Sequence, residues 1–292
     1  MTVAESLTVS VLGLGAMGSR MAARLLDAGY RVHVYNRSRE RPAVQQLIDA
    51  GAQYFDTPRA AVERAQLVIA VVTDDEAARA IWLAPDTGAL AALRADALAV
   101  ESSTLTPGCV AELTEAFTSA ARAFLDAPVV GTRPQAEAGA LVHLVGGDAE
   151  DLERARPVLA HLGKAVHHLG PAGAGAKLKL VVNALFALQV AAMGELLGAA
   201  QNMGLDAGAT LEVLGQLPVT SPAAKGTASL MLAGEFAPLF PIDLVEKDLR
   251  YMGEAADPSR VPLCAAARAV YAEAQAGGYG GDNIVGVGRL YL

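Results

Sequence analysis

Up to Gly170, short apolar runs alternate with longer stretches whose apolar residues recur at helical spacing. The runs have the length and β-branched content of strands, and the stretches between them are typical of amphipathic helices. The run 67–72 is apolar throughout, as expected for a strand covered on both faces. This alternation predicts a doubly wound α/β sheet. The predicted strands are 9–12, 31–35, 67–72, 98–101, 123–126 and 141–145, and the predicted helices are 17–28, 42–50 and 106–118.

Beyond Gly170 the strand pattern stops. Residues 174–203 have helical character throughout, which predicts one helix roughly 40 Å long. Shorter helical segments are predicted at 206–216, 222–233, 243–255 and 260–276. We therefore predict an α/β domain of residues 1–170 and an all-helical domain of residues 171–292, joined by the long helix.

Composition excludes several classes of protein. Of the 292 residues 53% are apolar, so the chain can bury a large core and is not disordered. The net charge is −8 without a run of Lys or Arg, which argues against nucleic-acid binding. The most apolar run, 178–193, is interrupted by Lys179, Asn183 and Gln189, so a buried helix explains it better than a membrane span.

The cysteines and histidines indicate neither a disulfide framework nor a metal site. Cys109 and Cys264 lie far apart, and the five histidines lack metal-ligand spacing. The first residues lack the basic start and apolar core of a signal peptide. We expect free thiols, no bound metal and a cytoplasmic protein.

A glycine-rich motif, GxGxxG, follows the first predicted strand and opens the first predicted helix. That context is typical of a Rossmann domain, in which the helix N-terminus binds the pyrophosphate of a dinucleotide. Gly13 would make the tight turn, Gly15 would admit the pyrophosphate, and Gly18 would let helix and strand pack closely. The predicted cofactor-binding residues here are Gly13, Leu14, Gly15, Ala16, Met17 and Gly18.

The end of the second strand indicates which dinucleotide is preferred. An NAD site usually carries an acidic residue there, whereas this chain has Asn36, Arg37 and Ser38. Arg37 could make charge-assisted bonds to a 2′-phosphate, and Ser38 could donate another. The pattern favours NADP(H), with NAD(H) still possible. Alternatively, Arg37 is only a solvated surface charge.

Lys179 and Asn183 are four residues apart in the apolar run, so they lie on one face of the predicted helix. Because the nicotinamide carries the hydride, the protein must supply orientation and a proton. A buried lysine suits this role, since desolvation lowers its pKa toward the working pH. We predict Lys179 as general acid/base and Asn183 as its orienting neighbour, with Lys177 on another face. Gly173 and Gly175 would leave room for substrate or nicotinamide.

These residues resemble the β-hydroxyacid dehydrogenases, most closely the glyoxylate/succinic semialdehyde reductase branch around Lys179. The resemblance covers nearly the whole chain in the right order. It is carried by the segments 13–18, 36–38, 101–104, 126–129, 136–139, 173–183, 240–241 and 247–248.

The resemblance implies an N-terminal Rossmann domain and a helical, 6-phosphogluconate dehydrogenase-like C-terminal domain. It implies that Thr104 sits near the nicotinamide ribose or substrate, and that Phe240 and Lys247 close the site, with Asp248 nearby. The segment after the third long strand would line the cofactor groove mostly by backbone; its residues are Val72, Thr73 and Asp74. Thr104 could instead cap a helix, Phe240 could belong to the core, and Lys247–Asp248 could be a surface pair.

One departure from the family pattern concerns the substrate. Where the family has Ser-Gly-Gly to hold the substrate carboxylate, this chain has Val130, Gly131 and Thr132. The side chain of Val130 donates no hydrogen bond, so a site built for a carboxylate loses one donor. Either Thr132 or Arg133 replaces this donor, or the substrate is less polar there, for example a bulkier aldehyde, ketone or imine.

Three functions are therefore kept. The first is an NADP-dependent dehydrogenase or reductase of a small hydroxyacid or semialdehyde. The second is an imine reductase or a reductase of a less polar carbonyl, which Val130 favours and Lys179 disfavours. The third is a non-catalytic NADP-binding protein, which Lys179 also disfavours. The long apolar helix predicts a homodimer or homotetramer, because its surface exceeds what one small domain covers.

Overall fold

The computed structural model describes residues 7–292 and contains two compact units, Met1–Lys179 and Leu180–Leu292. The predicted boundary at Gly170 falls earlier than this division. The first residues of the long helix, α9 (Ala174–Asn202), belong to the first unit because they bond to its β-sheet region through Asp126.

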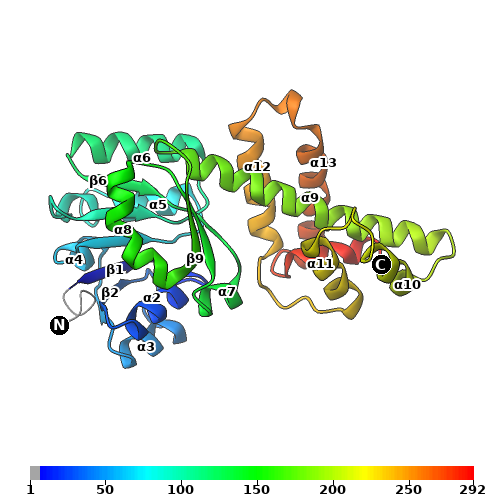
Figure 1. Cartoon of the computed structure of the whole chain (residues 1–292), viewed down its shortest axis with the longest axis horizontal. Helices are drawn as coiled ribbons and strands as arrows, with labels where there is room; N and C mark the ends of the chain where they lie inside the picture. The colour runs from blue at the N-terminus through cyan, green and yellow to red at the C-terminus, as the bar shows by residue number, and fades with distance from the viewer. Residues whose placement is uncertain (1–6) are drawn as a thin grey trace. The chain divides into compact units, whose positions relative to one another are not determined.

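The first unit is built on a six-stranded parallel sheet in the order β3-β2-β1-β4-β5-β6 (Figure 1). The chain moves outward from β1 in one direction and then returns to β4 on its other side. Ligands of such sheets bind beyond the carboxyl ends of the strands at this switch point. The strands are β1 (Thr8–Leu12), β2 (Arg31–Tyr35), β3 (Gln53–Tyr54), β4 (Leu67–Ala70), β5 (Leu98–Glu101) and β6 (Ala123–Asp126).

Helices cover both faces of this sheet, as the apolar strands require. In β4, Leu67 and Ile69 face one core, and Val68 and Ala70 face the other. One core is shared with α2 (Gly18–Asp27), α3 (Pro42–Asp49) and α8 (Ala149–Leu162). The other is shared with α4 (Pro58–Val62), α5 (Asp75–Leu83) and α6 (Pro107–Ser119). A short 3-10 helix, η1, spans Leu90–Ala92.

A smaller three-stranded sheet completes the first unit, with β7 (Val129–Val130), β8 (Leu141–Val145) and β9 (Gly163–His168) in that order. Helix α7 (Arg133–Glu137) connects β7 to β8. His143 in β8 is completely buried, and desolvation lowers its pKa to about 4. It is therefore a neutral core residue at physiological pH.

The second unit is helical. Its core joins α9 residues such as Ala187 and Val190 to α12, α13 and the C-terminal segment. Its elements after α9 are α10 (Ala207–Leu214), α11 (Pro222–Ala233), α12 (Ile242–Ala255), η2 (Pro258–Arg260), α13 (Pro262–Ala274), the π-helical turn η3 (Gln275–Tyr279) and η4 (Ile284–Leu290).

The predicted fold class and the longer elements are confirmed, with ends shifted by a few residues. The elements that the pattern missed are mostly short or polar: β3, α4, α5, β7, α7, α8 and β9. Helix α8 is long, but Pro157 lies inside it, and the sequence pattern predicted no helix there. Cys109 and Cys264 are buried free thiols, as predicted.

Among the described residues, α9 alone is long and apolar enough to cross a membrane by length and composition. A core helix of a globular protein meets the same criteria. Half of its most apolar window is buried within the protein, which agrees with the predicted core helix.

Candidate functional site

The glycine-rich loop between β1 and α2 needs two of its glycines for the fold itself. Gly13 has a φ of +95°, and a Cβ there would overlap the carbonyl oxygen of Val71. A Cβ on Gly18 would overlap the carbonyl oxygen of Gly13. A side chain at Gly13 would push the loop away from the segment after β4, and a side chain at Gly18 would force the loop and the helix apart.

Gly15 is different, because a Cβ there would meet no atom of the described residues within 4 Å. Packing within the protein therefore does not demand a glycine at this position. The space lies at the start of α2, where free backbone N–H groups and the helix dipole favour an anion. Gly15 leaves room for a phosphate to approach the backbone, so the loop fits a dinucleotide.

Asn36, at the end of β2, holds the glycine-rich loop in place. Its Oδ1 accepts a 2.9 Å hydrogen bond from the Leu14 N–H, and its Nδ2 donates a 2.8 Å bond to the carbonyl of Ser38. The side chain of Asn36 is thus committed to the protein. Arg37 is exposed and makes no hydrogen bond or ion pair with the described residues, so its guanidinium is available to a ligand.

The loops after β4 and β5 are tied together beside this switch point. The Val72 N–H donates a 2.7 Å hydrogen bond to Ser103 Oγ. Asp74 caps α5 by accepting a 2.8 Å bond from the Ala77 N–H. Predicted site residues Val72, Thr73, Asp74 and Thr104 lie on these two loops.

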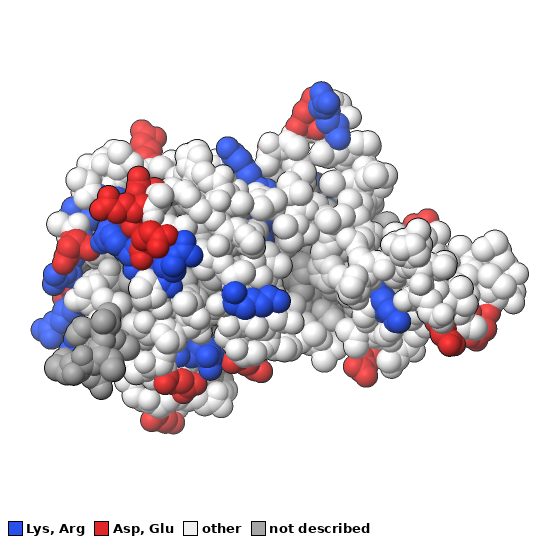
Figure 2. Space-filling view, in the orientation of Figure 1, with Lys and Arg blue, Asp and Glu red and all other residues white. Residues whose placement is uncertain are grey.

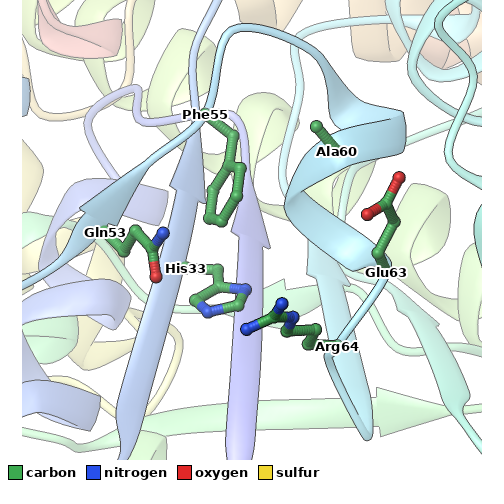
Figure 3. Close-up of a pocket in the computed structure, with 6 residues that line it drawn as sticks. All are labelled: His33, Gln53, Phe55, Ala60, Glu63 and Arg64. Atoms are coloured by element: carbon green, nitrogen blue, oxygen red, sulfur yellow. The ribbon is translucent and has the colours of Figure 1, made fainter.

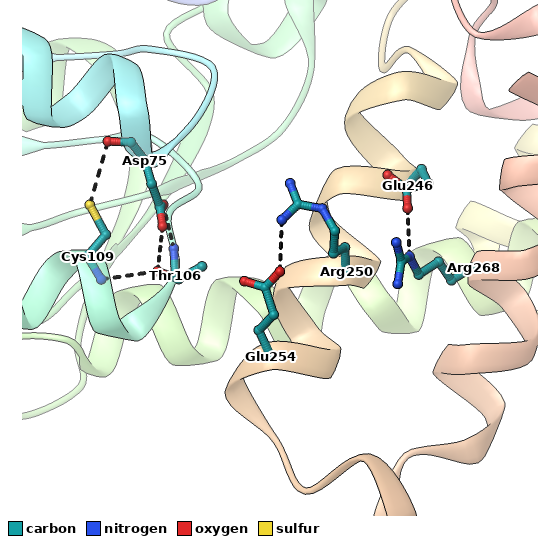
Figure 4. Close-up of polar contacts among 7 residues, drawn as sticks. All are labelled: Asp75, Thr106, Cys109, Glu246, Arg250, Glu254 and Arg268. Atoms are coloured by element: carbon teal, nitrogen blue, oxygen red, sulfur yellow. Dashed lines mark hydrogen bonds and ion pairs between the residues drawn. The ribbon is translucent and has the colours of Figure 1, made fainter.

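Asp75 makes a second connection between the same loops. Its carboxylate accepts hydrogen bonds from the backbone N–H and the hydroxyl of Thr106, at 2.9 and 2.6 Å (Figure 4). Thr106 Oγ1 in turn accepts from the Cys109 N–H at 3.0 Å, so Thr106 and not Thr104 is the N-cap of α6.

Two buried carboxylates at strand ends were missed by the sequence reasoning. Glu101 ends β5 and is 1% exposed, with hydrogen bonds from Trp82 and Ser103. Asp126 ends β6 and accepts bonds from the Gly173 and Ala176 N–H groups at 2.7 and 2.8 Å. The available signal was a single acidic residue closing an otherwise apolar strand.

Asp126 fixes the start of α9 and therefore the helix that carries Lys179. Burial raises the pKa of Asp126, and the bonds from Ala176 and Gly173 oppose that rise. A Cβ on Gly175 would overlap the carbonyl oxygen of Leu144. The interpretation of Gly175 as space for substrate is therefore wrong, because this glycine allows α9 to pack closely on β8.

Lys179 is 8% exposed, whereas Lys177 is exposed, as the helical spacing predicted. Asn183 follows one turn after Lys179 in α9 and is also 8% exposed. A buried lysine four residues from a buried amide is the pattern that the sequence indicated.

In the second unit, Asn183 Nδ2 donates a 2.5 Å hydrogen bond to Asp248 Oδ2. Lys247 Nζ lies 3.1 Å from Asp248 Oδ1 and 4.9 Å from the centre of the Tyr251 ring. Asp248 is 4% exposed, so the alternative of a surface Lys247–Asp248 pair is wrong. Asp248 orients the amide of Asn183. The same helix, α12, bears exposed ion pairs such as Arg250–Glu254 (Figure 4).

Phe240 packs against the core of the second unit, and its N–H donates a 3.1 Å hydrogen bond to Asn283 Oδ1. It is only partly buried. These contacts agree with the alternative that Phe240 belongs to the core. Its role toward a substrate stays a prediction.

The loop that departs from the family pattern begins in β7. Val130 is half-buried, and Gly131 has a φ of +132°. The Thr132 hydroxyl donates a 2.8 Å hydrogen bond to Gln135 Oε1 within a capping box of α7. Arg133 Nε is buried and has no hydrogen-bond partner among the described residues.

A small pocket of about 200 Å³ lies on the α4 side of the main sheet. His33 and Phe55 form its floor and wall, with Arg64 at its side (Figure 3). Ligand pockets usually measure roughly 300–1,000 Å³, so this one is too small for a dinucleotide. None of the predicted cofactor residues lines it. Within residues 7–292, no group of three or more His, Cys, Asp or Glu side chains could hold a metal ion.

Two family models together match nearly the whole chain, one in each half. The NAD binding domain of 6-phosphogluconate dehydrogenase matches residues 8–170. The NAD-binding region of NADP-dependent 3-hydroxyisobutyrate dehydrogenase matches residues 173–291.

Similarities to individual proteins point to the same family. Glyoxylate/succinic semialdehyde reductase 1 of Arabidopsis thaliana is 31% identical over 93% of this chain and 94% of its own length. The 3-hydroxyisobutyrate dehydrogenase of Pseudomonas aeruginosa is 37% identical over 71% of this chain and 69% of its own. The solved structure of Mycobacterium tuberculosis 3-hydroxyisobutyrate dehydrogenase with L-serine has a TM-score of 0.87 at 30% identity. It covers 97% of this chain and 98% of that one.

The chain belongs to the β-hydroxyacid dehydrogenase family. As a β-hydroxyacid dehydrogenase it is an oxidoreductase that uses a nicotinamide cofactor and acts on CH–OH groups. The open space at Gly15 leaves room for a phosphate of this family's cofactor at the start of α2.

Proposed function

We propose that this β-hydroxyacid dehydrogenase interconverts a small hydroxyacid and its semialdehyde with NADP(H), and that Lys179 is the general acid/base. When bound, the nicotinamide supplies or accepts the hydride. During reduction the Lys179 ammonium donates a proton to the alkoxide oxygen that forms, and during oxidation its amine removes the hydroxyl proton. The observation that carries this proposal is a buried lysine on a helix whose start is bonded to the end of β6.

Asn183 is the proposed partner of Lys179 at the substrate. Its bond to Asp248 commits one of the amide donors and fixes the rotation of the side chain. A fixed amide can orient a substrate oxygen without a loss of side-chain entropy on binding.

Lys179→Ala should lower kcat for aldehyde reduction by about 10²- to 10⁴-fold, because the proton donor is lost. The Kd for NADPH should stay within about twofold, a margin of a few tenths of a kcal/mol. The measurements are NADPH oxidation at 340 nm and NADPH fluorescence titration.

Lys177→Ala is the matched control, because it removes a lysine from the exposed side of the same helix. Its kcat should equal that of the wild type. Wild-type turnover by the Lys179 variant would rule out the proposed acid/base role.

The preference for NADP(H) rests on the end of β2. It has no carboxylate to repel a 2′-phosphate, and Arg37 is exposed and makes no hydrogen bond or ion pair within residues 7–292. A guanidinium bonds a phosphate through two N–H groups at once. The matching family model is also described as that of an NADP-dependent enzyme.

Arg37→Ala should raise the Kd for NADP⁺ by about 10- to 100-fold, the range for loss of a hydrogen bond to a charged group. Binding of NAD⁺ should hardly change, because NAD⁺ has no 2′-phosphate. Calorimetric titration with both cofactors measures the two values. Arg64→Ala, an exposed arginine of the same unit that lines the small pocket, is the control. An equal loss of both cofactors in the Arg37 variant would contradict the assignment.

For the substrate we propose that Arg133 takes the place of the family's serine as the carboxylate-binding donor. The Thr132 hydroxyl is committed to Gln135, whereas Arg133 Nε is buried without a hydrogen-bond partner in the described part of the chain. A buried donor that lacks an acceptor is costly, and a substrate carboxylate would relieve that cost. Imines and less polar carbonyls remain the alternative substrates, since they need no such donor.

Arg133→Ala should raise KM for glyoxylate and succinic semialdehyde by about tenfold. KM for an uncharged aldehyde of similar size should stay the same. Val130→Ser, which adds a hydroxyl donor, should lower KM for the two carboxylate substrates. If neither variant changes turnover of these acids, or if an imine is the better wild-type substrate, the carboxylate assignment is wrong.

Self-association stays a prediction. On α9, Leu185 and Leu196 are about three turns apart and are 57% and 58% exposed, and Met203, directly after the helix, is 73% exposed. On the face drawn in Figure 2, wide areas of the second unit carry no charged side chain. An apolar helix face of this kind is typical of a surface that a second copy covers. A light-scattering mass equal to the 30.0 kDa of one chain would contradict it.

A further inference from the structure

Glu101 occupies an unusual position for a carboxylate. It is the last residue of a central strand and is 1% exposed. Its Oε2 accepts a 2.7 Å hydrogen bond from Trp82 Nε1, and its Oε1 accepts a 2.8 Å bond from the Ser103 N–H. Both the side chain and the backbone of Ser103 hydrogen-bond to Glu101, so its donors come from two segments, α5 and the loop after β5.

The contact continues from Glu101 through Ser103 to the neighbouring loop. The Ser103 N–H donates a hydrogen bond to Glu101, and Ser103 Oγ accepts the 2.7 Å bond from the Val72 N–H. The Glu101 carboxylate thus determines where Ser103 lies, and Ser103 determines where the backbone of Val72 lies. Val72 and Thr104 are both predicted cofactor-site residues.

We propose that Glu101 is a positioning residue for cofactor binding, which acts through Ser103 to hold the loop after β4 and the loop after β5 at the spacing that the cofactor requires. This inference rests on the proposed function only in its assumption that these two loops contact NADP(H). Its chemistry concerns the protein alone.

A carboxylate suits this position better than an amide would. Both of its oxygens accept hydrogen bonds, so it satisfies two N–H donors that face each other across it. A glutamine has one acceptor oxygen and one NH₂ group, and the NH₂ group would face a donor. Replacing Glu101 by Gln should therefore displace either Trp82 or Ser103, with little change in side-chain volume.

Protonation should have a similar effect, because a neutral carboxyl group carries its own donor. Burial raises the pKa of Glu101 to about 7, against the bonds from Ser103 and Trp82 that lower it, and the charge of Asp126 on β6 adds to the rise. Cys109 on α6 also interacts electrostatically with Glu101, and burial raises the pKa of its thiol to about 12, so it stays neutral. The hydrogen bonds from Trp82 and Ser103 to Glu101 should therefore be intact above pH 7 and weaken below it.

Trp82 is the only tryptophan of the chain, so its emission reports directly on this contact. In the wild type without cofactor, the emission should titrate with a midpoint near pH 7. In Glu101→Gln the titration should be absent. Glu112→Gln is the matched control, because Glu112 on α6 pairs with Arg79 on α5 at the partly exposed surface. This control should titrate like the wild type.

Cofactor affinity is the second readout. At pH 8, Glu101→Gln should raise the Kd for NADP⁺ by about tenfold and should abolish the additional weakening that the wild type shows between pH 8 and pH 6. Trp82→Phe combined with Glu101→Gln should bind NADP⁺ more tightly than Glu101→Gln alone, because the donor facing the amide NH₂ is gone. Calorimetry on the purified full chain measures each value.

Ser103→Ala keeps the test decisive if the glutamine variant does not fold. It removes the link to Val72 and the side-chain bond of Ser103 to Glu101, but leaves the bonds from Trp82 and from the Ser103 N–H in place. It should raise the Kd for NADP⁺ about tenfold while the Trp82 titration persists. Wild-type Kd values in both Glu101→Gln and Ser103→Ala would overturn the positioning role. Failure of the wild type itself to bind NADP⁺ would instead refute the proposed function, and the Trp82 titration would still report on the contact.

Discussion

The buried carboxylate of Asp126 is the constraint on which the candidate site depends. It lies at the end of β6 and accepts the backbone N–H groups of Gly173 and Ala176 at the start of α9. Burying a carboxylate is unfavourable unless it is hydrogen-bonded, and here two N–H groups and a helix N-terminus offset that cost. The glycine at 175 lets the helix pack against the carbonyl of Leu144. Together these contacts fix the start of the helix that presents Lys179.

The same device recurs at the carboxyl ends of the other strands. Asn36 binds the glycine-rich loop to the end of β2, Asp75 links the starts of α5 and α6, and Glu101 links Trp82 to Ser103. In each case a side chain satisfies backbone or ring N–H groups that have no partner in regular secondary structure. These hydrogen bonds fix the loops at this edge of the sheet. Gly15 and Arg37 take no part in them and remain open to a ligand.

The proposed cofactor residues and the proposed substrate residues lie on different segments of the first unit. The cofactor side of the first unit follows the family pattern closely, so membership of the family accounts for the hydride chemistry. The loop after β7 departs from it, with Val130 in place of a hydroxyl donor and with an Arg133 Nε that is buried and unpaired within residues 7–292. Under the proposed roles, chemistry and substrate choice depend on different segments, and the substrate segment can change without disturbing the strand ends that hold the cofactor loops.

The sequence alone determined the fold class, the longer elements and the glycine-rich loop, and it placed Lys179 and Asn183 on one helix face, because periodicity and motif spacing are local properties of the chain. It also placed Lys177 on the exposed side of the helix. It missed the short elements, in which too few residues show a period, and it missed Glu101 and Asp126. Their partners are 19 and 47 or 50 residues away in sequence, and only the folded chain brings them together. Likewise, tertiary structure alone decided that Gly175 serves packing whereas Gly15 does not, since that difference depends on which distant atoms surround the missing side chain.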